Sequence, residues 1–289
     1  MKDKITAILK KYAGHEHVFL TPSGNKAIFI SLNIIKESPN ATLLIPDQGG
    51  WFTYSQYAKK LKFNIKILKT DYGIIDLDFL KDNIKEASAI IYSNPAAYYA
   101  EQPVKDIYEL CRKNNVLVIL DISGCIGSDF YKGNYADVIV CSFGRWKPLN
   151  LGYGGFISIA NKGISEIHEN QKFLGHRKSE GFSSENKKML ESLEFDENYY
   201  AALYPKLKNL KKRYEFFEKT NKKIKDELKN FNILHKNKEG INVIAGFLND
   251  GEKNRIISYC EKNKYEFVVC PKPIRVNENA ISIEVKRLE

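Results

Sequence analysis

The 289-residue sequence lacks the features that mark several large classes of protein. No apolar run approaches the roughly 20 residues of a membrane-spanning helix, and the charged N-terminal segment has no small-residue cleavage site of a signal peptide. No internal repeat or low-complexity tract is present, and the five histidines have no metal-ligand spacing. The five cysteines form no Cys-x-x-Cys pair, which favours reduced thiols. We therefore expect a cytoplasmic protein without a membrane span or a metal site.

The composition is that of a globular protein with a large core. Hydrophobic residues make up 43% of the chain and aromatic residues 12%. A chain of this length is expected to form a main domain and a smaller one. We predict a large domain over residues 15–200 and a long helix with a small C-terminal domain over residues 201–289. The N-terminal helix, residues 1–14, is expected to pack with this second part.

Helical and strand-like segments alternate through residue 140. This alternation predicts an α/β fold with a mostly parallel sheet and helices on both faces. The strands are expected at 41–46, 63–68, 89–92, 116–120, 138–141 and 156–160, and the helices at 2–13, 27–35, 77–85 and 104–114. A last α/β unit is expected from strands at 241–247, 266–270 and 280–285 with a helix at 250–263.

Two residues at strand ends point to a chemical function. The buried strand 116–120 ends on Asp121, and ligands of open α/β sheets bind at the carboxyl ends of strands. Lys147 follows 26 residues later, between the strand 138–141 and a glycine-rich turn. A lysine held at the rim of a sheet can form a Schiff base with a carbonyl, although an ordinary β-hairpin with a surface lysine fits the stretch equally well. A carboxylate paired with such a lysine is what pyridoxal phosphate (PLP) enzymes need.

Three motifs carry a resemblance to a known family. They are Asp121 to Gly127 at a strand end, Ser142-Phe143 and Lys147 followed by the Gly152–Gly155 turn, and an early Ser23-Gly24 before a helix. Over roughly residues 18 to 160 the chain resembles fold-type-I PLP enzymes, nearest the DegT/DnrJ/EryC1/StrS aminotransferase group.

The resemblance implies a fold, a cofactor and residue roles. It implies a PLP-dependent aminotransferase-like enzyme acting on a small-molecule amino donor and acceptor. Lys147 would be the Schiff-base lysine, Asp121 would lie at the pyridine nitrogen, and Ser142 would bind the cofactor. The resemblance also implies a homodimer with a site built between subunits. Two positions depart from the family pattern, because Gly124 stands where His or Gln is frequent and Tyr153 where an acidic residue is usual.

Two further stretches are candidate cofactor sites. Ser23, Gly24 and Asn25 open an apolar helix, whose free N–H groups could hold a phosphate, although simple capping by Ser23 fits the pattern alone. Trp51 follows two glycines and could stack on the pyridine ring, with Phe52 as the alternative. A core tryptophan is the competing interpretation.

Asn94 completes the set of candidate cofactor residues. It follows the strand 89–92 and precedes Pro95. Its amide could donate to the phenolic oxygen of PLP, as an Asn-Pro pair does in many fold-type-I aminotransferases. Asn-Pro is also an ordinary turn.

The net charge of +10 is concentrated in residues 206–238. This segment has 12 Lys and Arg against 4 Asp and Glu, and its apolar spacing from Leu203 to Phe231 predicts one long amphipathic helix. A nucleic-acid or acidic-partner surface is one interpretation. A solvated helix face is favoured, because no aromatic or arginine cluster accompanies the lysines.

The reaction type is the least specified prediction. Amino transfer commonly needs a basic group that holds the substrate carboxylate. Arg275 and Arg145 are the candidates, although the pattern favours an exposed strand-edge position for Arg275. His176 and Arg177 lie in a predicted loop, where a surface role is favoured. Transamination is the favoured reaction, with elimination or desulfurisation, or a non-catalytic nucleic-acid-binding relative, as alternatives.

Overall fold

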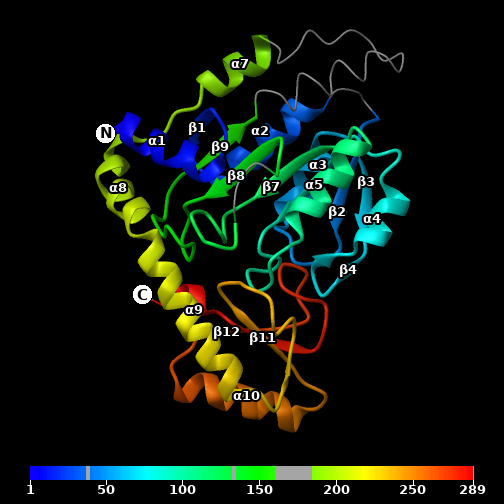
Figure 1. Ribbon diagram of the computed structural model, residues 1–289, viewed down its shortest axis with the longest axis vertical. Helices are drawn as coiled ribbons and strands as arrows, with labels where there is room; N and C mark the ends of the chain where they lie inside the picture. Colours follow the sequence, from blue (N-terminus) through cyan, green and yellow to red (C-terminus); the bar gives the residue numbers. More distant parts are fainter. Residues whose placement is uncertain (37–39, 132–134, 161–183, 289) are drawn as a thin grey trace.

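The computed structural model describes residues 1–36, 40–131, 135–160 and 184–288. A large sheet with its helices forms the upper part of the molecule in Figure 1, and a smaller sheet with helix α10 (Asp250–Lys262) forms the lower part. Helices α8 (Tyr200–Lys208) and α9 (Leu210–Glu227) run along one side from the upper part to the lower.

The large sheet has seven strands in the order β1-β9-β8-β7-β6-β2-β3. The strands span β1 His17–Thr21, β2 Thr42–Pro46, β3 Asn64–Leu68, β6 Ala89–Ser93, β7 Leu117–Asp121, β8 Val138–Ser142 and β9 Gly155–Ile159. The five strands from β3 to β8 are mutually parallel, and β9 is antiparallel to both of its neighbours. The prediction of a mostly parallel sheet is confirmed.

Helices cover both faces of this sheet. In β7, Leu117 and Ile119 belong to one buried cluster, whereas Val118 and Leu120 belong to another, as expected for alternating strand residues. The first cluster includes residues of α2 and α3, and the second includes residues of α1, α4 and α5. These helices span α1 Lys2–Ala13, α2 Gly24–Ile35, α3 Thr53–Lys60, α4 Leu77–Asn83 and α5 Val104–Lys113. The remaining elements here are the hairpin of β4 (Thr70–Asp71) and β5 (Ile74–Ile75), and α7 (Ser184–Glu191).

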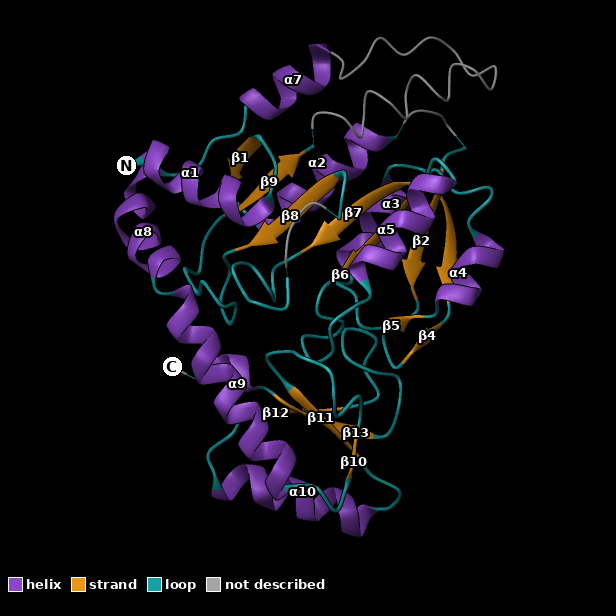
Figure 2. Cartoon of the chain, in the orientation of Figure 1, coloured by secondary structure: helices purple, strands orange, loops and turns teal. Residues whose placement is uncertain are grey.

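The carboxyl ends of three central strands meet at one edge of the sheet. Strands β6, β7 and β8 end at Ser93, Asp121 and Ser142, and Ser93 is the register partner of Asp121. In Figure 2, β7 and β8 run downwards and to the left, so that their arrowheads lie at the side of the large sheet that is nearer to the smaller one. Ligand binding is predicted from the sequence at this edge of the sheet.

The smaller sheet is antiparallel in the order β10-β11-β13-β12. Its strands span β10 Asn232–Ile233, β11 Val243–Gly246, β12 Phe267–Val269 and β13 Ala280–Ile283, and the short helix η2 (Val285–Arg287) follows. Residues of this sheet and of the large sheet join one buried hydrophobic cluster, so the two parts share a core. The predicted domain boundary at residue 200 stays a prediction.

The prediction of one long helix from Leu203 to Phe231 is wrong. The chain forms two helices, α8 and α9, which are separated at Asn209. The Asn209 N–H is shared between the carbonyls of Pro205 and Lys206, and the Leu207 carbonyl accepts a hydrogen bond from the Tyr12 hydroxyl of α1 at 3.2 Å. The Asn209 N–H thus divides between the regular i−4 carbonyl and the i−3 carbonyl, and asparagine is a weak helix former, so the helical geometry is interrupted here.

Helix α9 has the predicted two faces. Its buried residues are Leu210, Tyr214, Phe217, Asn221 and Ile224, whereas Lys211, Lys212, Lys222 and Lys223 are exposed. Asn221, which interrupts the apolar spacing, donates to the Gly240 carbonyl at 2.7 Å. The buried Nδ2 thereby has a partner within the apolar face, whereas the Asn221 Oδ1 has none.

The described residues contain neither a membrane-spanning helix nor a group of metal-binding side chains. None of the helices in these ranges is both long enough and apolar enough to cross a membrane. Within the same ranges, no three His, Cys, Asp or Glu side chains are grouped so that they could hold a metal ion.

Candidate active site

A cavity of about 390 Å³ lies at the carboxyl edge of the large sheet. It is lined by seven of the eight predicted site residues, namely Ser23, Gly24, Asn25, Trp51, Asp121, Ser142 and Lys147. Its volume is in the range of small-molecule sites. A larger groove of about 960 Å³ between α1, β1 and residues 189–197 includes none of these seven side chains. The predicted residues are therefore brought together by the fold.

The N-terminus of α2 forms one end of the cavity. Ser23 caps the helix, with its Oγ accepting from the Lys26 N–H at 3.1 Å. Gly24 packs so closely on β8 that a Cβ there would lie 2.4 Å from the Ser142 Cβ. The absence of a side chain at Gly24 lets the first turn of the helix and the Ser142 hydroxyl approach each other. Free N–H groups and a hydroxyl at one end of a cavity suit a phosphate.

Asp121 is held rigidly at the end of β7. Its Oδ2 accepts a hydrogen bond from the Tyr54 hydroxyl at 2.7 Å, and its Oδ1 accepts from the Ser123 N–H at 2.9 Å. The side chain is buried, and its two hydrogen bonds leave acceptor capacity on both oxygens. Burial and the neighbouring Asp121 carboxylate raise the pKa of the Tyr54 hydroxyl, so that this phenol remains a donor. A fixed carboxylate with free acceptor capacity suits a protonated ring nitrogen.

Trp51 and Asn25 are coupled to each other beside the cavity. The Trp51 Nε1–H donates to the Asn25 Oδ1 at 2.9 Å, which fixes the plane of the indole. The Lys147 Nζ lies 5.1 Å from the centre of the Trp51 ring. Trp51 therefore presents an aromatic surface to the cavity, and Asn25 orients that surface with its side chain.

Lys147 projects from the loop between β8 and β9. Its Nζ donates a hydrogen bond to the Tyr98 hydroxyl and lies 4.4 Å from the centre of the Tyr98 ring. The loop is shaped by Trp146, which has a φ of 63° and whose N–H donates to the Asn150 Oδ1 at 3.0 Å. A left-handed non-glycine residue marks a backbone held by its surroundings. The loop therefore holds the Lys147 amine in the cavity and not on the protein surface.

Asn94 is the one predicted residue that does not line the main cavity, although its N–H donates to the Asp121 carbonyl at 2.9 Å. It lines a small adjoining pocket that also reaches Asp121, not the main cavity. Its Oδ1 accepts from the Gln102 N–H at 2.9 Å, and its Nδ2 donates to the Cys125 Sγ at 3.5 Å. The side chain is buried and has partners on both ends, so its predicted role toward the cofactor stays a prediction.

The prediction of an exposed position for Arg275 is wrong. Arg275 is 4% exposed and lines the cavity. Its Nε and Nη2 donate to the two oxygens of Glu284, each at 2.8 Å. A buried guanidinium requires such a partner. Arg145 also lines the cavity, with its guanidinium 5.0 Å from the centre of the Trp146 ring; His176 and Arg177 lie outside the described residues.

A model of the DegT/DnrJ/EryC1/StrS aminotransferase family matches residues 2–249, which is most of the chain. The chain belongs to this family. The predicted family and fold class are thereby confirmed, together with the prediction of a PLP-dependent transferase.

Solved structures of the same fold cover nearly the whole chain. A putative sugar aminotransferase from Streptococcus pneumoniae in its PMP form is 15% identical, with a TM-score of 0.68, covering 99% of this chain and 86% of that one. The E. coli GDP-4-keto-6-deoxy-D-mannose-3-dehydratase with bound hydrated PLP is 12% identical, with a TM-score of 0.69 and coverage of 97% and 87%. A 3-amino-5-hydroxybenzoic acid synthase is 12% identical, with a TM-score of 0.68 and coverage of 99% and 87%. At these identities the likeness establishes the fold.

Both departures from the DegT/DnrJ/EryC1/StrS pattern have a structural reason. A Cβ at Gly124 would lie 2.8 Å from the Pro95 Cδ and 3.0 Å from the Tyr98 ring, so Tyr98 fills the space of a larger residue. Tyr153 stacks on Tyr199 with ring centres 4.3 Å apart. The aromatic residue at this position of the turn therefore packs against the segment that leads into α8.

Several cavity residues of this family member were missed by sequence reasoning. Tyr98 touches Lys147, but its φ of 70° follows another left-handed residue, Ala97, and no sequence signal predicts that turn. Ser123, two residues after Asp121, could have been found from its position at the strand end. Lys286 lines the cavity from η2, directly after the last strand. Ser282, Glu284 and Lys286 stand at alternate positions of the sequence, and this polar alternation could have marked it.

Proposed function

We propose that this protein is a PLP-dependent aminotransferase in which Lys147 is the Schiff-base lysine and Asp121 pairs with the pyridine nitrogen. The observation that carries the proposal is the single cavity bordered by Lys147, Asp121 and the first turn of α2. When bound, PLP supplies an electron sink that stabilises negative charge at the substrate α-carbon. The donors at Ser23, Gly24 and Ser142 suit its phosphate, and Trp51 offers a face for its ring.

Residues of the chain bind the cofactor, move the proton and position the amine. Asp121 keeps the pyridine nitrogen protonated, and the Tyr54 hydroxyl and the Ser123 N–H fix the direction of the carboxylate. The Lys147 Nζ moves the proton of the substrate α-carbon. The Tyr98 hydroxyl, which accepts from that Nζ, positions the amine.

Amino transfer is favoured over desulfurisation by the state of the thiols. All five cysteines are free and buried. Burial raises the pKa of each thiol, including the Cys125 and Cys141 thiols near the cavity. A nucleophilic cysteine needs a lowered pKa and access to solvent. The described cysteines therefore do not suit a desulfurase that uses a thiolate nucleophile.

The test is a half-reaction with the PLP-loaded protein. Amino acids are added one at a time, and we expect at least one to convert the cofactor spectrum to that of pyridoxamine phosphate. The control is the Lys147→Ala variant, which should show no conversion on the same timescale. Catalytic release of ammonia, sulfide or carbon dioxide without any conversion would establish a lyase instead.

A glycine substitution tests the phosphate end. In Gly24→Ala the new Cβ would meet the Ser142 side chain and Cα, so the helix must move away from β8. Overpacking of this kind typically costs about 1–3 kcal/mol, and we expect PLP affinity to fall by about tenfold or more. The measurement is a PLP titration by absorbance.

The control for this substitution is Gly251→Ala at the exposed start of α10. A Cβ at Gly251 would lie 3.1 Å from its nearest neighbour, the Oδ1 of the Asn249 side chain. It should leave PLP affinity unchanged. Wild-type affinity in Gly24→Ala would contradict the assignment of the α2 N-terminus to the cofactor phosphate.

We also propose that the protein is a homodimer, as the resemblance to its family implies. Phe52 and Trp146, both close to the cavity, are 46% and 38% exposed, which would suit coverage by a second subunit. Sedimentation of the PLP-loaded protein tests this, and a stable monomer with a reactive cofactor would contradict it.

A further inference from the structure

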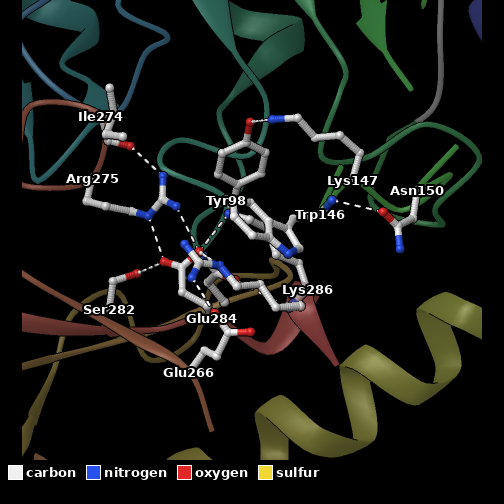
Figure 3. A network of polar contacts seen from close by, with 12 residues as sticks. Tyr98, Trp146, Lys147, Asn150, Glu266, Ile274, Arg275, Ser282, Glu284 and Lys286 are labelled. Atoms are coloured by element: carbon white, nitrogen blue, oxygen red, sulfur yellow. Dashed lines mark hydrogen bonds and ion pairs between the residues drawn. The ribbon is translucent and has the colours of Figure 1, made fainter. Parts of the chain in front are cut away.

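A buried charge cluster forms the wall of the cavity that faces the small sheet (Figure 3). The Glu284 carboxylate accepts from the Arg275 Nε and Nη2 at 2.8 Å, from the Ser282 hydroxyl at 2.8 Å and from the Lys286 Nζ at 2.7 Å. The side chains of Arg275, Glu284 and Lys286 are 5%, 0% and 4% exposed. One carboxylate is thus shared between two buried cations.

The cations of this cluster face the cavity. Arg275 and Lys286 line it, whereas Glu284 is fully buried behind them. The Lys286 Nζ lies 4.0 Å from the centre of the Tyr98 ring, and the Arg275 guanidinium 5.2 Å. Lys147 contacts the same residue at its hydroxyl end, on the side away from Glu284 in Figure 3. The Tyr98 ring therefore separates the proposed Schiff-base lysine from a second lysine in one cavity.

Positive charge exceeds negative charge around Lys286. The groups that face it are Glu284, Arg275, Lys147 and the ring of Tyr98. Arg287, on the same short helix, also approaches Glu284 at 3.5 Å, although it pairs with Glu266 at 2.6 Å. The guanidiniums cannot release a proton, so Lys286 is the group that can relieve the excess.

The electrostatic direction agrees with this geometry. Burial lowers the pKa of the Lys286 amine well below its ordinary value, Glu284 opposes the shift, and Arg275 adds to it, as does Lys147 while its amine is free. Burial raises the pKa of Glu284, and the neighbouring Lys286 and Arg275 lower it overall; because the guanidinium keeps its charge, Glu284 remains paired with a cation when Lys286 is neutral. A lysine in such a site is ready to gain a proton when a new negative charge arrives.

We propose that Lys286 is a proton-exchanging residue of the active site, neutral in the resting cavity and converted to an ammonium when a substrate carboxylate binds beside Arg275. The step is a proton transfer only, in which the Lys286 lone pair takes one proton from the solvent and no carbon bond changes. With two N–H groups of Arg275 and two of protonated Lys286 not used toward Glu284 or Ile274, the pair can hold a carboxylate. The proposal rests on the proposed function, because it places the substrate in the Lys147 cavity.

The test counts protons during binding of maleate, an unreactive dicarboxylate, to the PLP-loaded protein. Calorimetric titrations at about pH 8, where an ordinary lysine is protonated, are run in buffers of different ionisation enthalpy. We expect an uptake approaching about one proton per maleate in the wild type. The visible band of the cofactor reports any proton that the cofactor itself gains, and that count is subtracted.

Two variants and a control assign the proton to its residue. Lys286→Arg keeps a permanent charge and Lys286→Met removes the amine, so both variants should lose the proton uptake. Lys286→Met should also bind maleate about tenfold more weakly, as expected for losing one charged hydrogen bond. The control is Lys272→Arg, an exposed lysine in the connection between β12 and β13 that also carries Arg275, and it should behave as the wild type.

Three results would overturn the proposal: no uptake in the wild type, equal uptake in the Lys286 variants, or no binding of maleate. Uptake with inorganic phosphate but not with maleate would also reject a carboxylate site. Failure of the proposed function is seen separately, because it would remove the visible cofactor band in the wild-type protein. An intact band without Lys286-dependent uptake overturns only the role of Lys286.

Discussion

Lys147→Ala is expected to abolish the visible band of covalently held PLP and to reduce turnover by about 10²–10⁴-fold or more, the range that a positioned proton-transfer group contributes. Lys147 lies in the loop after β8, and its Nζ donates to the Tyr98 hydroxyl inside the cavity. The variant loses this amine. The substitution therefore removes both of the roles proposed for Lys147, the covalent attachment of the cofactor and the movement of the α-proton.

The measurement for this variant combines a visible spectrum after dialysis against buffer without PLP with a turnover assay. Lys211→Ala on the exposed face of α9 is the matched control, and it should retain both signals. Partial recovery of turnover by added methylamine in Lys147→Ala would support loss of an amine instead of a folding defect. A full visible band in dialysed Lys147→Ala would contradict the assignment.

Asp121→Asn is expected to keep PLP bound but to reduce turnover by about 10²–10³-fold, the effect of removing one preorganised electrostatic group. The asparagine carbonyl can still accept from the Tyr54 hydroxyl or the Ser123 N–H, so the local geometry is largely kept. The variant loses the negative charge that we propose keeps the pyridine nitrogen protonated.

Tyr54→Phe is the companion variant, because it removes only the 2.7 Å hydrogen bond to Asp121. We expect a smaller loss of turnover, about tenfold, consistent with one hydrogen bond to a charged group. Turnover and the pH dependence of the cofactor spectrum are measured for both variants. Turnover of Asp121→Asn within a few-fold of the wild type would refute the role of Asp121.

The strand ends were predictable because they depend on local patterns. Apolar β-branched runs specify buried parallel strands, and a polar residue directly after such a run lies at the carboxyl edge. Asp121 and Ser142 are of this kind, and both line the cavity. The approach of Ser23 and Gly24 to β8 also agrees with the motif, because only glycine fits the space beside Ser142.

The charged wall of the cavity was not predictable in the same way. The burial of Arg275 depends on Glu284, which is nine residues away in sequence and reaches it through the fold of the small sheet. The direction of Asn94 depends on the Gln102 N–H, and the break at Asn209 on the Tyr12 hydroxyl of α1. Each outcome was decided by a partner distant in sequence, which neither periodicity nor turn chemistry indicates.

The central claim is that one particular lysine holds the cofactor. The most direct measurement is reduction of the PLP-loaded protein with borohydride, followed by peptide mapping by mass spectrometry. We predict a single pyridoxyl adduct, on Lys147 in the loop between β8 and β9. An adduct on Lys286, the other lysine that lines the cavity, or an unmodified Lys147 in fully loaded protein would contradict the account.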